Sequence, residues 1–212
     1  MAWNVDIDAR ASSTVVFMTS INPSAEVKAS IMGPEGLPAR IAELELGGKT
    51  EQELRDHPEE RGEILLDAAA VLRGDGELTR ALGVYQYLIE EAVDREDAQY
   101  ATVGKIDVLL ERGDGTAADA ELRELWSRGP MEGPAVLLGE LLEGNGRMED
   151  ALSWFDFACR GHLNSSVEQL EDVDLAYVPE LVGRARVRGA LGYASDEFDL
   201  LVCTHREKWL GG

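Results

Sequence analysis

Three short glycine-containing turns recur through the middle of the chain, and this repetition restricts the fold more than any other sequence feature. The turns are Arg73-Gly74-Asp75-Gly76, Arg112-Gly113-Asp114-Gly115 and Glu143-Gly144-Asn145-Gly146. Their first glycines stand at positions 74, 113 and 144, a mean period of about 35 residues. Such a period is typical of proteins built from stacked supersecondary units, so we expect an array of similar units.

The apolar residues on either side of each turn recur at three- and four-residue steps, as they do on the buried face of a helix. Glycine after such a run adopts the left-handed conformation that ends a helix. The sequence therefore predicts three helix pairs, 58–72 with 77–93, 97–111 with 116–127, and 134–143 with 147–161. Because a unit of two helices cannot bury its apolar stripes alone, the pairs must stack on one another. The predicted fold is all-α.

The second helices of the first and third pairs resemble the second helix of the tetratricopeptide repeat. That family carries a small residue where its two helices cross and an aromatic residue four positions later. The matching residues are Ala81 with Tyr85 in the segment 78–85 (LTRALGVY) and Ala151 with Phe155 in the segment 146–155 (GRMEDALSWF). The small residues of the first helices fall on Ala69 and Gly139. The resemblance covers residues 58–162, about half of the chain.

The middle pair departs from this pattern. Counted from the last glycine of its turn, it has Ala120 at the crossing and Glu124 where the family has an aromatic residue. Its apolar stripes are also out of register with the turn, so we expect the middle repeat to be degenerate. The resemblance implies a right-handed superhelix of antiparallel helix pairs, with helical caps and a concave groove that binds a partner's peptide or helix.

Four regions are predicted along the chain. They are an irregular N-terminal segment (1–36), N-terminal capping helices (37–57), the three repeat-like helix pairs (58–162) and a C-terminal helical capping pair (163–212). Within the first region, residues 14–18 (TVVFM) are typical of a short strand or a buried extended segment.

The two capping regions carry helix signals of their own. The amphipathic segment 37–46 predicts a short helix, and Thr50 with Glu53 forms a capping box that begins another. At the other end, Pro179–Leu191 is predicted to be helical. The run Ser195-Asp196-Glu197 is then expected to cap a last helix that extends to about Trp209.

The resemblance also implies which residues line the groove, because the first helix of each pair supplies its inner wall. These residues are Glu63, Asp67, Ala70, Arg73, Thr102, Lys105, Arg112, Glu140 and Glu143. Their mixed charge with acidic ends favours a basic or amphipathic partner segment. The family's carboxylate-binding clamp needs lysines and asparagines, and only Lys105 falls suitably, so no clamp is predicted. The sequence favours a non-catalytic protein–protein interaction module.

The acidity of the chain bears on its partners. Forty-one Asp and Glu residues against 20 Lys and Arg residues give a net charge of −21. A phosphate backbone needs a cationic counterpart, so direct nucleic-acid binding is not expected. Residues 59–170 carry a net charge of −14. An alternative function is therefore an acidic decoy that mimics nucleic acid and inhibits a DNA- or RNA-binding protein.

Three arginines form a basic island on this acidic chain. Arg184, Arg186 and Arg188 alternate along the predicted helix 179–191. They are candidates for contact with phosphate, RNA or an acidic partner. Pairing with acidic residues of the same chain, either just upstream or on the preceding helices, is the favoured interpretation because local charge pairing is common on helical arrays.

Cellular location is predicted from what the sequence lacks. No stretch approaches the roughly 20 apolar residues of a membrane span. The start, MAWNVDIDAR, has neither a basic region nor an apolar region of a signal peptide. Two cysteines do not make a disulfide scaffold. We therefore expect a cytoplasmic protein without a membrane contact; the sequence does not indicate its oligomeric state.

Motifs for cofactor or metal chemistry are weak. Gly47-Gly48-Lys49-Thr50 lacks the earlier glycine and the preceding strand of a phosphate-binding loop. Cys159, His162, Cys203 and His205 would suit a zinc ion, but the cysteines continue apolar helix faces and are expected to be buried. No cofactor, metal or catalytic residue is predicted. A third hypothesis, a regulatory subunit with a small ligand between the array and the C-terminal helices, is also open.

Overall fold

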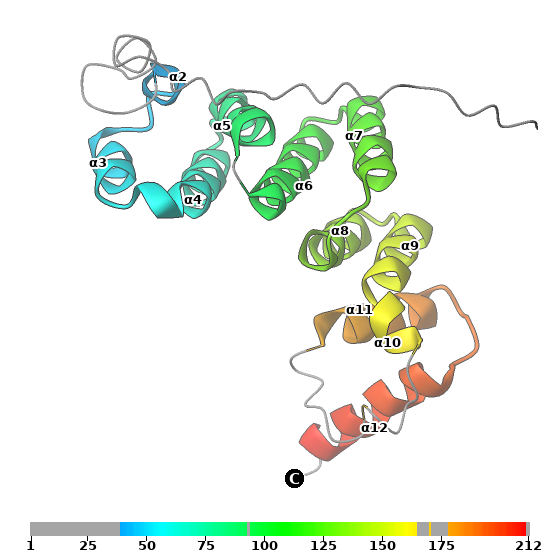
Figure 1. Ribbon diagram of the computed structural model, residues 1–212. Coiled ribbons are helices and arrows are strands. Elements are labelled where there is room, and N and C mark those ends of the chain that lie inside the picture. The colour runs from blue at the N-terminus through cyan, green and yellow to red at the C-terminus, as the bar shows by residue number, and fades with distance from the viewer. Residues whose placement is uncertain (1–38, 93, 165–169, 171–177, 211–212) are drawn as a thin grey trace, which may run out of the picture.

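The computed structural model describes residues 39–92, 94–164, 170 and 178–210, and within these residues the protein contains helices and no strand (Figure 1). The prediction of an all-α fold is thereby confirmed. The predicted segment 1–36, with its short strand at 14–18, lies outside the described residues.

The helices follow the predicted pairs closely. They are α2 (Ala39–Ala42), α3 (Gly48–Asp56), the 3-10 turn η1 (Pro58–Glu60), α4 (Arg61–Gly74), α5 (Leu78–Glu91), α6 (Arg95–Glu111), α7 (Gly115–Arg128), α8 (Glu132–Gly144), α9 (Met148–Ala158), α10 (Arg160–Leu163), α11 (Pro179–Ala190) and α12 (Glu197–Leu210). Figure 1 shows them side by side in a row that bends between α7 and α8.

The helix ends confirm one predicted cap and correct another. The Asp196 carboxylate accepts the backbone N–H groups of Phe198 at 3.1 Å and Asp199 at 3.0 Å, as expected for the cap of α12. In contrast, α3 begins at Gly48 and its N-cap is Gly47, at φ 91° and without a side-chain hydrogen bond. Thr50 therefore lies inside α3, and the predicted capping box is wrong.

Among the helices that the structure describes, four end in the same left-handed glycine turn. In each, the N–H after the glycine reaches back to a carbonyl five residues earlier, which satisfies an otherwise unpaired helix end. The glycines have φ between 74° and 80°, a conformation that side chains with a Cβ rarely adopt. They are Gly76 of α4, Gly113 of α6, Gly146 of α8 and Gly192 of α11.

This turn corrects the register of the middle pair. The left-handed residue there is Gly113, the first glycine of its turn, whereas the other two turns use their second glycine. The Asp114 carboxylate accepts the Ala117 N–H at 3.2 Å, so α7 begins at Gly115. The residue at the helix crossing is therefore Ala118, which is fully buried, and the predicted positions Ala120 and Glu124 are wrong.

Aromatic residues of the second helices pack into glycines of the neighbouring first helices. Phe155 of α9 is fully buried, and a Cβ added at Gly139 of α8 or Gly183 of α11 would lie under 3 Å from its ring. Tyr85 of α5 meets Gly104 of α6 in the same way. Each ring thus wedges between consecutive first helices, which sets the spacing of the row.

The middle pair lacks this wedge. The α7 residue four positions after Ala118 is Leu122, an aliphatic residue in place of an aromatic ring. The α8 position that matches Gly104 and Gly183 is Leu137, whose side chain is 42% exposed. Accordingly α8 packs on α6 and α9, while α7 packs mainly on α6. The row bends at this same junction (Figure 1).

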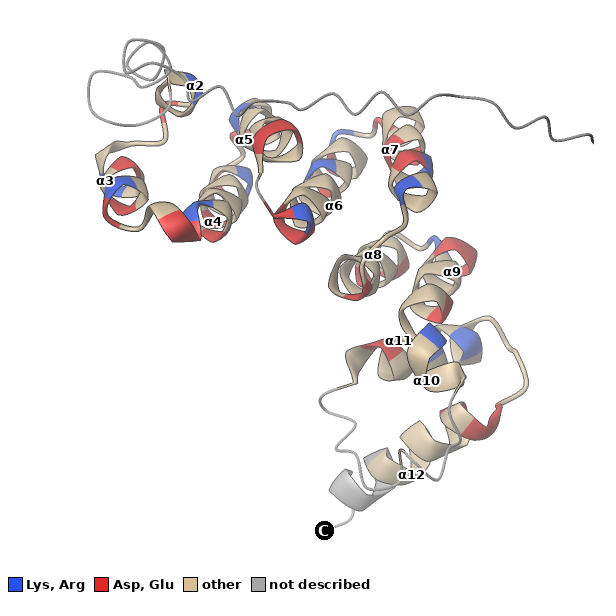
Figure 2. Cartoon of the chain, viewed as in Figure 1, with Lys and Arg blue, Asp and Glu red and all other residues tan. Residues whose placement is uncertain are grey.

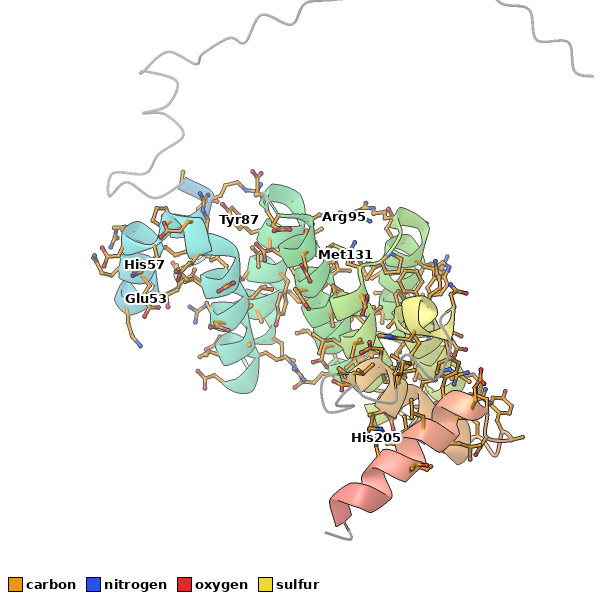
Figure 3. The ribbon with its side chains drawn as sticks, turned by 60° about the horizontal axis from the view of Figure 1, so that its bottom comes forward. Glu53, His57, Tyr87, Arg95, Met131 and His205 are labelled. Carbon is orange, nitrogen blue, oxygen red and sulfur yellow. The ribbon has the colours of Figure 1, made fainter. Side chains whose placement is uncertain are left out.

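The loop between α7 and α8 is held by side chains of α6. Gln99 is buried; its amide donates to the Gly129 carbonyl at 3.2 Å and accepts the Met131 N–H at 2.7 Å. The Arg95 guanidinium donates to the carbonyls of Arg128 and Gly129. Figure 3 shows Arg95 and Met131 on the same edge of the molecule. These hydrogen bonds hold the α7–α8 loop against α6, at the place where α7 and α8 pack little on each other.

We expect Gln99→Met to lower the free energy of unfolding by about 1–2 kcal/mol, because it leaves the Met131 N–H without its partner. Urea denaturation followed by circular dichroism measures the change. Gln52→Met in the exposed face of α3 is the control and should change stability by less than about 0.5 kcal/mol. Equal effects of the two variants would contradict the role of Gln99.

Candidate functional site

The first helices α4, α6, α8 and α11 touch one another and form one continuous side of the molecule. We call this side the first-helix face. Side-chain contacts join neighbouring helices of this face. Between α4 and α6, the Asp97 carboxylate lies against Gly62, and Arg73 forms an ion pair with Asp107. Between α6 and α8, the Tyr100 hydroxyl lies against Gly133. The Arg186 guanidinium bridges α11 to Glu143 of α8 through two hydrogen bonds of 2.6 Å. The face therefore spans four helices.

Seven of the nine predicted groove residues lie on these helices or at their ends in exposed or half-buried positions. Glu63, Asp67 and Ala70 are exposed along α4, and Glu140 is exposed on α8. Arg73 and Glu143 take part in the contacts between helices, and Arg112 is exposed just after α6. Glu63, Asp67 and Ala70 thus lie on α4 and Glu140 on α8, two helices of the first-helix face.

Thr102 and Lys105 also belong to α6, but their side chains do not lie in the predicted groove, and their predicted place there is wrong. Thr102 is buried, and its hydroxyl donates to the Ala98 carbonyl at 2.8 Å. The Lys105 ammonium points to the second helices, 2.6 Å from Glu121 of α7 and 3.0 Å from Gln86 of α5. Both were placed by counting from Gly115. Counting from Gly113 instead identifies Tyr100, Gly104 and Asp107, which the sequence interpretation missed.

An acidic cleft of about 530 Å³ opens at the start of α4 and α6, where Figure 2 shows acidic residues on both helices. Its lining residues are Glu59, Glu60, Glu63, Asp94, Arg95 and Asp97. The Arg95 guanidinium is engaged by the loop carbonyls described above. Burial raises the pKa of Asp97, and the nearby charges of Asp94 and Glu63 raise it further. With five carboxylates and one guanidinium, the cleft carries a net negative charge.

Acidic residues on the second helices form ion pairs with cationic side chains more often than those on the first-helix face do. Arg40 pairs with Glu90 and Glu91, Arg147 pairs with Asp119 and Asp150, and Arg128 pairs with Glu124. By contrast, Glu63, Asp67 and Asp97 form no ion pair with any residue that the structure describes. The unpaired acidity is thus concentrated on the first-helix face.

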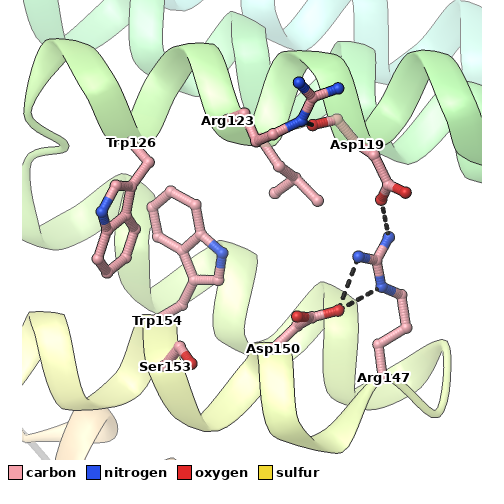
Figure 4. A pocket seen from close by; sticks show the side chains of 8 residues that line it. Asp119, Arg123, Trp126, Arg147, Asp150, Ser153 and Trp154 are labelled. Carbon is pink, nitrogen blue, oxygen red and sulfur yellow. Dashed lines mark hydrogen bonds and ion pairs between the residues drawn. The ribbon is translucent and has the colours of Figure 1, made fainter.

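A second hollow lies between α7 and α9, at the junction where the aromatic wedge is missing (Figure 4). It has a volume of about 450 Å³ and includes Leu122, Trp126 and Trp154. The Trp126 ring is 47% exposed and stands edge-on to Trp154, with ring centres 5.0 Å apart. Arg147 closes one end through ion pairs of 2.7 Å with Asp119 and Asp150. Trp126 was not among the residues that the sequence singled out as a candidate site.

The three arginines of α11 pair with acidic residues of the same chain, as the favoured interpretation predicts, but Arg188 and part of the Arg184 cluster use Asp196 and Asp199, which follow α11 and were not predicted as partners. Arg184 is buried, and its guanidinium contacts Asp156, Asp196 and Asp199. The other two are Arg186, paired with Glu143, and Arg188, paired with Asp196 and Asp199. These partners come from α8, α9 and α12 and the turn before α12. A basic contact patch is therefore not available at Arg184 or Arg188.

The predicted loop and cysteine features have structural roles. Gly47 and Gly48 lie between helices α2 and α3. The segment therefore follows a helix, as expected if it is not a phosphate-binding loop. Cys159 is buried in an apolar cluster, whereas Cys203 is exposed, contrary to expectation. Among the described residues, His162 is grouped with carboxylates and not with either cysteine.

Each described helix is too short or too polar to cross a lipid bilayer. Comparison with protein-family models gives no match. Comparisons with curated proteins and with solved structures likewise give no significant match. Any function must therefore be argued from the geometry and charge of the chain itself.

Proposed function

We propose that this protein is a non-catalytic interaction module of the tetratricopeptide-like class, in a right-handed superhelix, that binds a basic or amphipathic segment of a partner protein along the first-helix face. The observation that carries the proposal is the unpaired acidity of Glu63, Asp67 and Asp97 beside the acidic cleft. A cationic segment lying across α4 and α6 would offset the mutual repulsion of Asp97, Asp94 and Glu63. Complementary charge of this kind speeds association and selects the partner.

Apolar groups on the same face favour an amphipathic segment over a purely basic one. Leu137 of α8 is 42% exposed, and Tyr100 of α6 is half-buried with its hydroxyl against Gly133 of α8. Affinity in protein interfaces comes mainly from a few apolar and aromatic anchors, while charges around them give specificity. A helix or extended segment with lysines or arginines at one end and apolar residues toward the other fits this arrangement.

The acidic decoy is less well supported. A nucleic-acid mimic needs carboxylates that are free to meet the cationic surface of its target. On the second helices, Arg147, Arg128 and Arg40 already neutralise several of these groups. The free carboxylates instead follow one face of the row, which suits a segment better than a broad surface.

The proposal is tested with a fluorescein-labelled amphipathic Lys/Leu peptide of 16 residues, titrated with the protein in fluorescence anisotropy. The variant Glu63→Lys with Asp67→Lys should weaken binding by about 10-fold or more at low salt, and added salt should weaken the wild type. The control, Glu149→Lys with Glu197→Lys, makes the same charge change on α9 and α12. It should weaken binding by less than about twofold.

The outcomes separate the two functions. Equal losses in both variants would indicate attraction by net charge alone and favour the decoy. A wild type that binds the Lys/Leu peptide no better than the corresponding Glu/Leu peptide would refute both functions.

A further inference from the structure

Three side chains of metal-binding type meet where α8, α10 and α11 come together. Glu132 is the first residue of α8, His162 lies in α10 and Glu180 is the second residue of α11. Their ligand atoms all lie within 4.8 Å of one another, and His162 Nε2 is 2.9 Å from Glu180 Oε1. Because the residues come from three helices far apart in sequence, the group is a product of the tertiary fold.

The burial of these residues distinguishes the group from ordinary surface carboxylates. The Glu180 side chain is 6% exposed, and His162 is its hydrogen-bond partner among the described residues. A buried carboxylate is costly unless a cation or several donors compensate its charge. The neighbouring cation, Arg184, is already shared by three aspartates. His162 is 30% exposed and Glu132 is exposed, so an ion has a path from solvent to Glu180.

The ligand chemistry is that of zinc. An imidazole nitrogen and two carboxylate oxygens bind Zn²⁺ at about 2.0–2.2 Å, and such three-ligand sites complete their tetrahedron with water. Bonds of this length place ligands about 3.4 Å apart. The ligand atoms lie within 4.8 Å of one another, so the exposed Glu132 side chain needs to move by at most about 1.4 Å to close the site. Cys159, which the sequence suggested as a ligand beside His162, is not in this group.

We propose that Glu132, His162 and Glu180 form a binding site for a divalent transition-metal ion of the Zn²⁺ class, which ties the third helix pair to α11. The site is independent of the proposed partner binding, because it uses none of the acidic residues on which that proposal rests. A bound ion would add a link across the same junction that Phe155 and the Arg184 cluster hold, and would stabilise the folded chain.

The test uses the full chain, stripped of metal with a chelator and titrated with ZnCl₂ by calorimetry. We expect one high-affinity ion per chain and a rise in Tm of about 5 °C at saturating Zn²⁺. His162→Ala should weaken binding by more than about 100-fold, because losing a direct ligand costs more than the 10–100-fold typical of outer-shell partners. Glu132→Gln, at an exposed position, should weaken binding while leaving the circular dichroism spectrum unchanged.

His57→Ala and His205→Ala are the matched controls, since His57, His162 and His205 are the chain's 3 histidines. Figure 3 shows His57 and His205 at opposite ends of the molecule. Another His–carboxylate group, His57 with Glu59 and Glu60, consists of exposed residues from one short segment. Loss of binding in His57→Ala would place the ion there and overturn the proposal.

Two further results would also overturn it: no calorimetric binding by the wild type at about 100 μM Zn²⁺, or undiminished binding by His162→Ala. If His162→Ala fails to fold, Glu132→Gln decides the test, and an unchanged affinity then refutes the site. In each of these cases the three residues are a charge cluster at helix ends and not a ligand set.

Discussion

Arg184→Met is expected to lower the free energy of unfolding by about 3–5 kcal/mol, the usual cost of leaving a buried charge without its partner. The Arg184 side chain is 8% exposed and contacts Asp156 and Asp196 at 2.7 Å and Asp199 at 3.3 Å. Asp199 is itself buried, so the variant leaves its carboxylate with Arg188 as its remaining cationic partner, beside the Asp196 N–H. Urea denaturation at pH 7 measures the loss.

The same cluster gives the variant a distinct pH dependence. Burial tends to raise the pKa of Asp196, but hydrogen bonds and charge from Arg184 outweigh it, and the pKa is lowered overall. A carboxyl group whose pKa is lower in the folded state stabilises the protein above its unfolded pKa, near 3.9, and loses that contribution as pH falls through the folded value. The wild type should therefore lose stability as pH falls below about 4, and Arg184→Met should lose less.

Arg186→Met is the control for both measurements. Arg186 lies in the same helix and forms two hydrogen bonds to Glu143, but its side chain is 52% exposed. An exposed ion pair contributes about 0–1 kcal/mol, so this variant should remain close to the wild type. If Arg184→Met and Arg186→Met unfold at the same urea concentration, the buried cluster does not hold α11 and α12 in the way described.

Phe155→Ala is expected to destabilise the protein by about 3–5 kcal/mol, because it removes a fully buried ring and leaves a cavity between α8, α9 and α11. Thermal and urea denaturation should both show the change. Phe157, on the same helix, is only partly buried, and Phe157→Ala should cost less. Similar losses for Phe155→Ala and Phe157→Ala would contradict the wedge.

A glycine substitution tests the same packing from the opposite side. Gly183→Ala adds a methyl group against the Phe155 ring, and overpacking of this kind costs about 1–3 kcal/mol. Gly189→Ala adds the same group to the same helix where nothing lies within 4 Å, and it should be neutral or stabilising by up to about 1 kcal/mol. Equal effects at Gly183 and Gly189 would show that the ring and the glycine do not constrain each other.

Helix identity could be predicted from the sequence because its causes are local. The apolar periodicity and the glycine turns place α4 to α9, α11 and α12 to within a few residues. The register of the middle pair was harder to predict from the sequence. Its turn holds two glycines, and which one becomes left-handed depends on the Asp114 cap that begins α7. Counting from the wrong glycine moved Thr102 and Lys105 into the predicted groove.

The candidate sites depended on contacts that no local pattern encodes. The acidic cleft is lined by Glu63 and Asp97, which come from two different helices. The hollow at Trp126 and Trp154 is likewise lined by residues from two helices. The sequence gives the number of charged residues but does not indicate which arginine pairs with which carboxylate. Arg95, for example, lines the cleft while its guanidinium is taken by loop carbonyls.

The sequence by itself determined that this chain is an array of paired helices, since backbone hydrogen bonds, glycine turns and apolar stripes act over only a few residues. The tertiary structure alone decided how the helix pairs are spaced, where the row bends and which carboxylates stay unpaired. Those features arise from long-range packing: Phe155 and Tyr85 find glycines on neighbouring helices, whereas Leu122 meets no such partner.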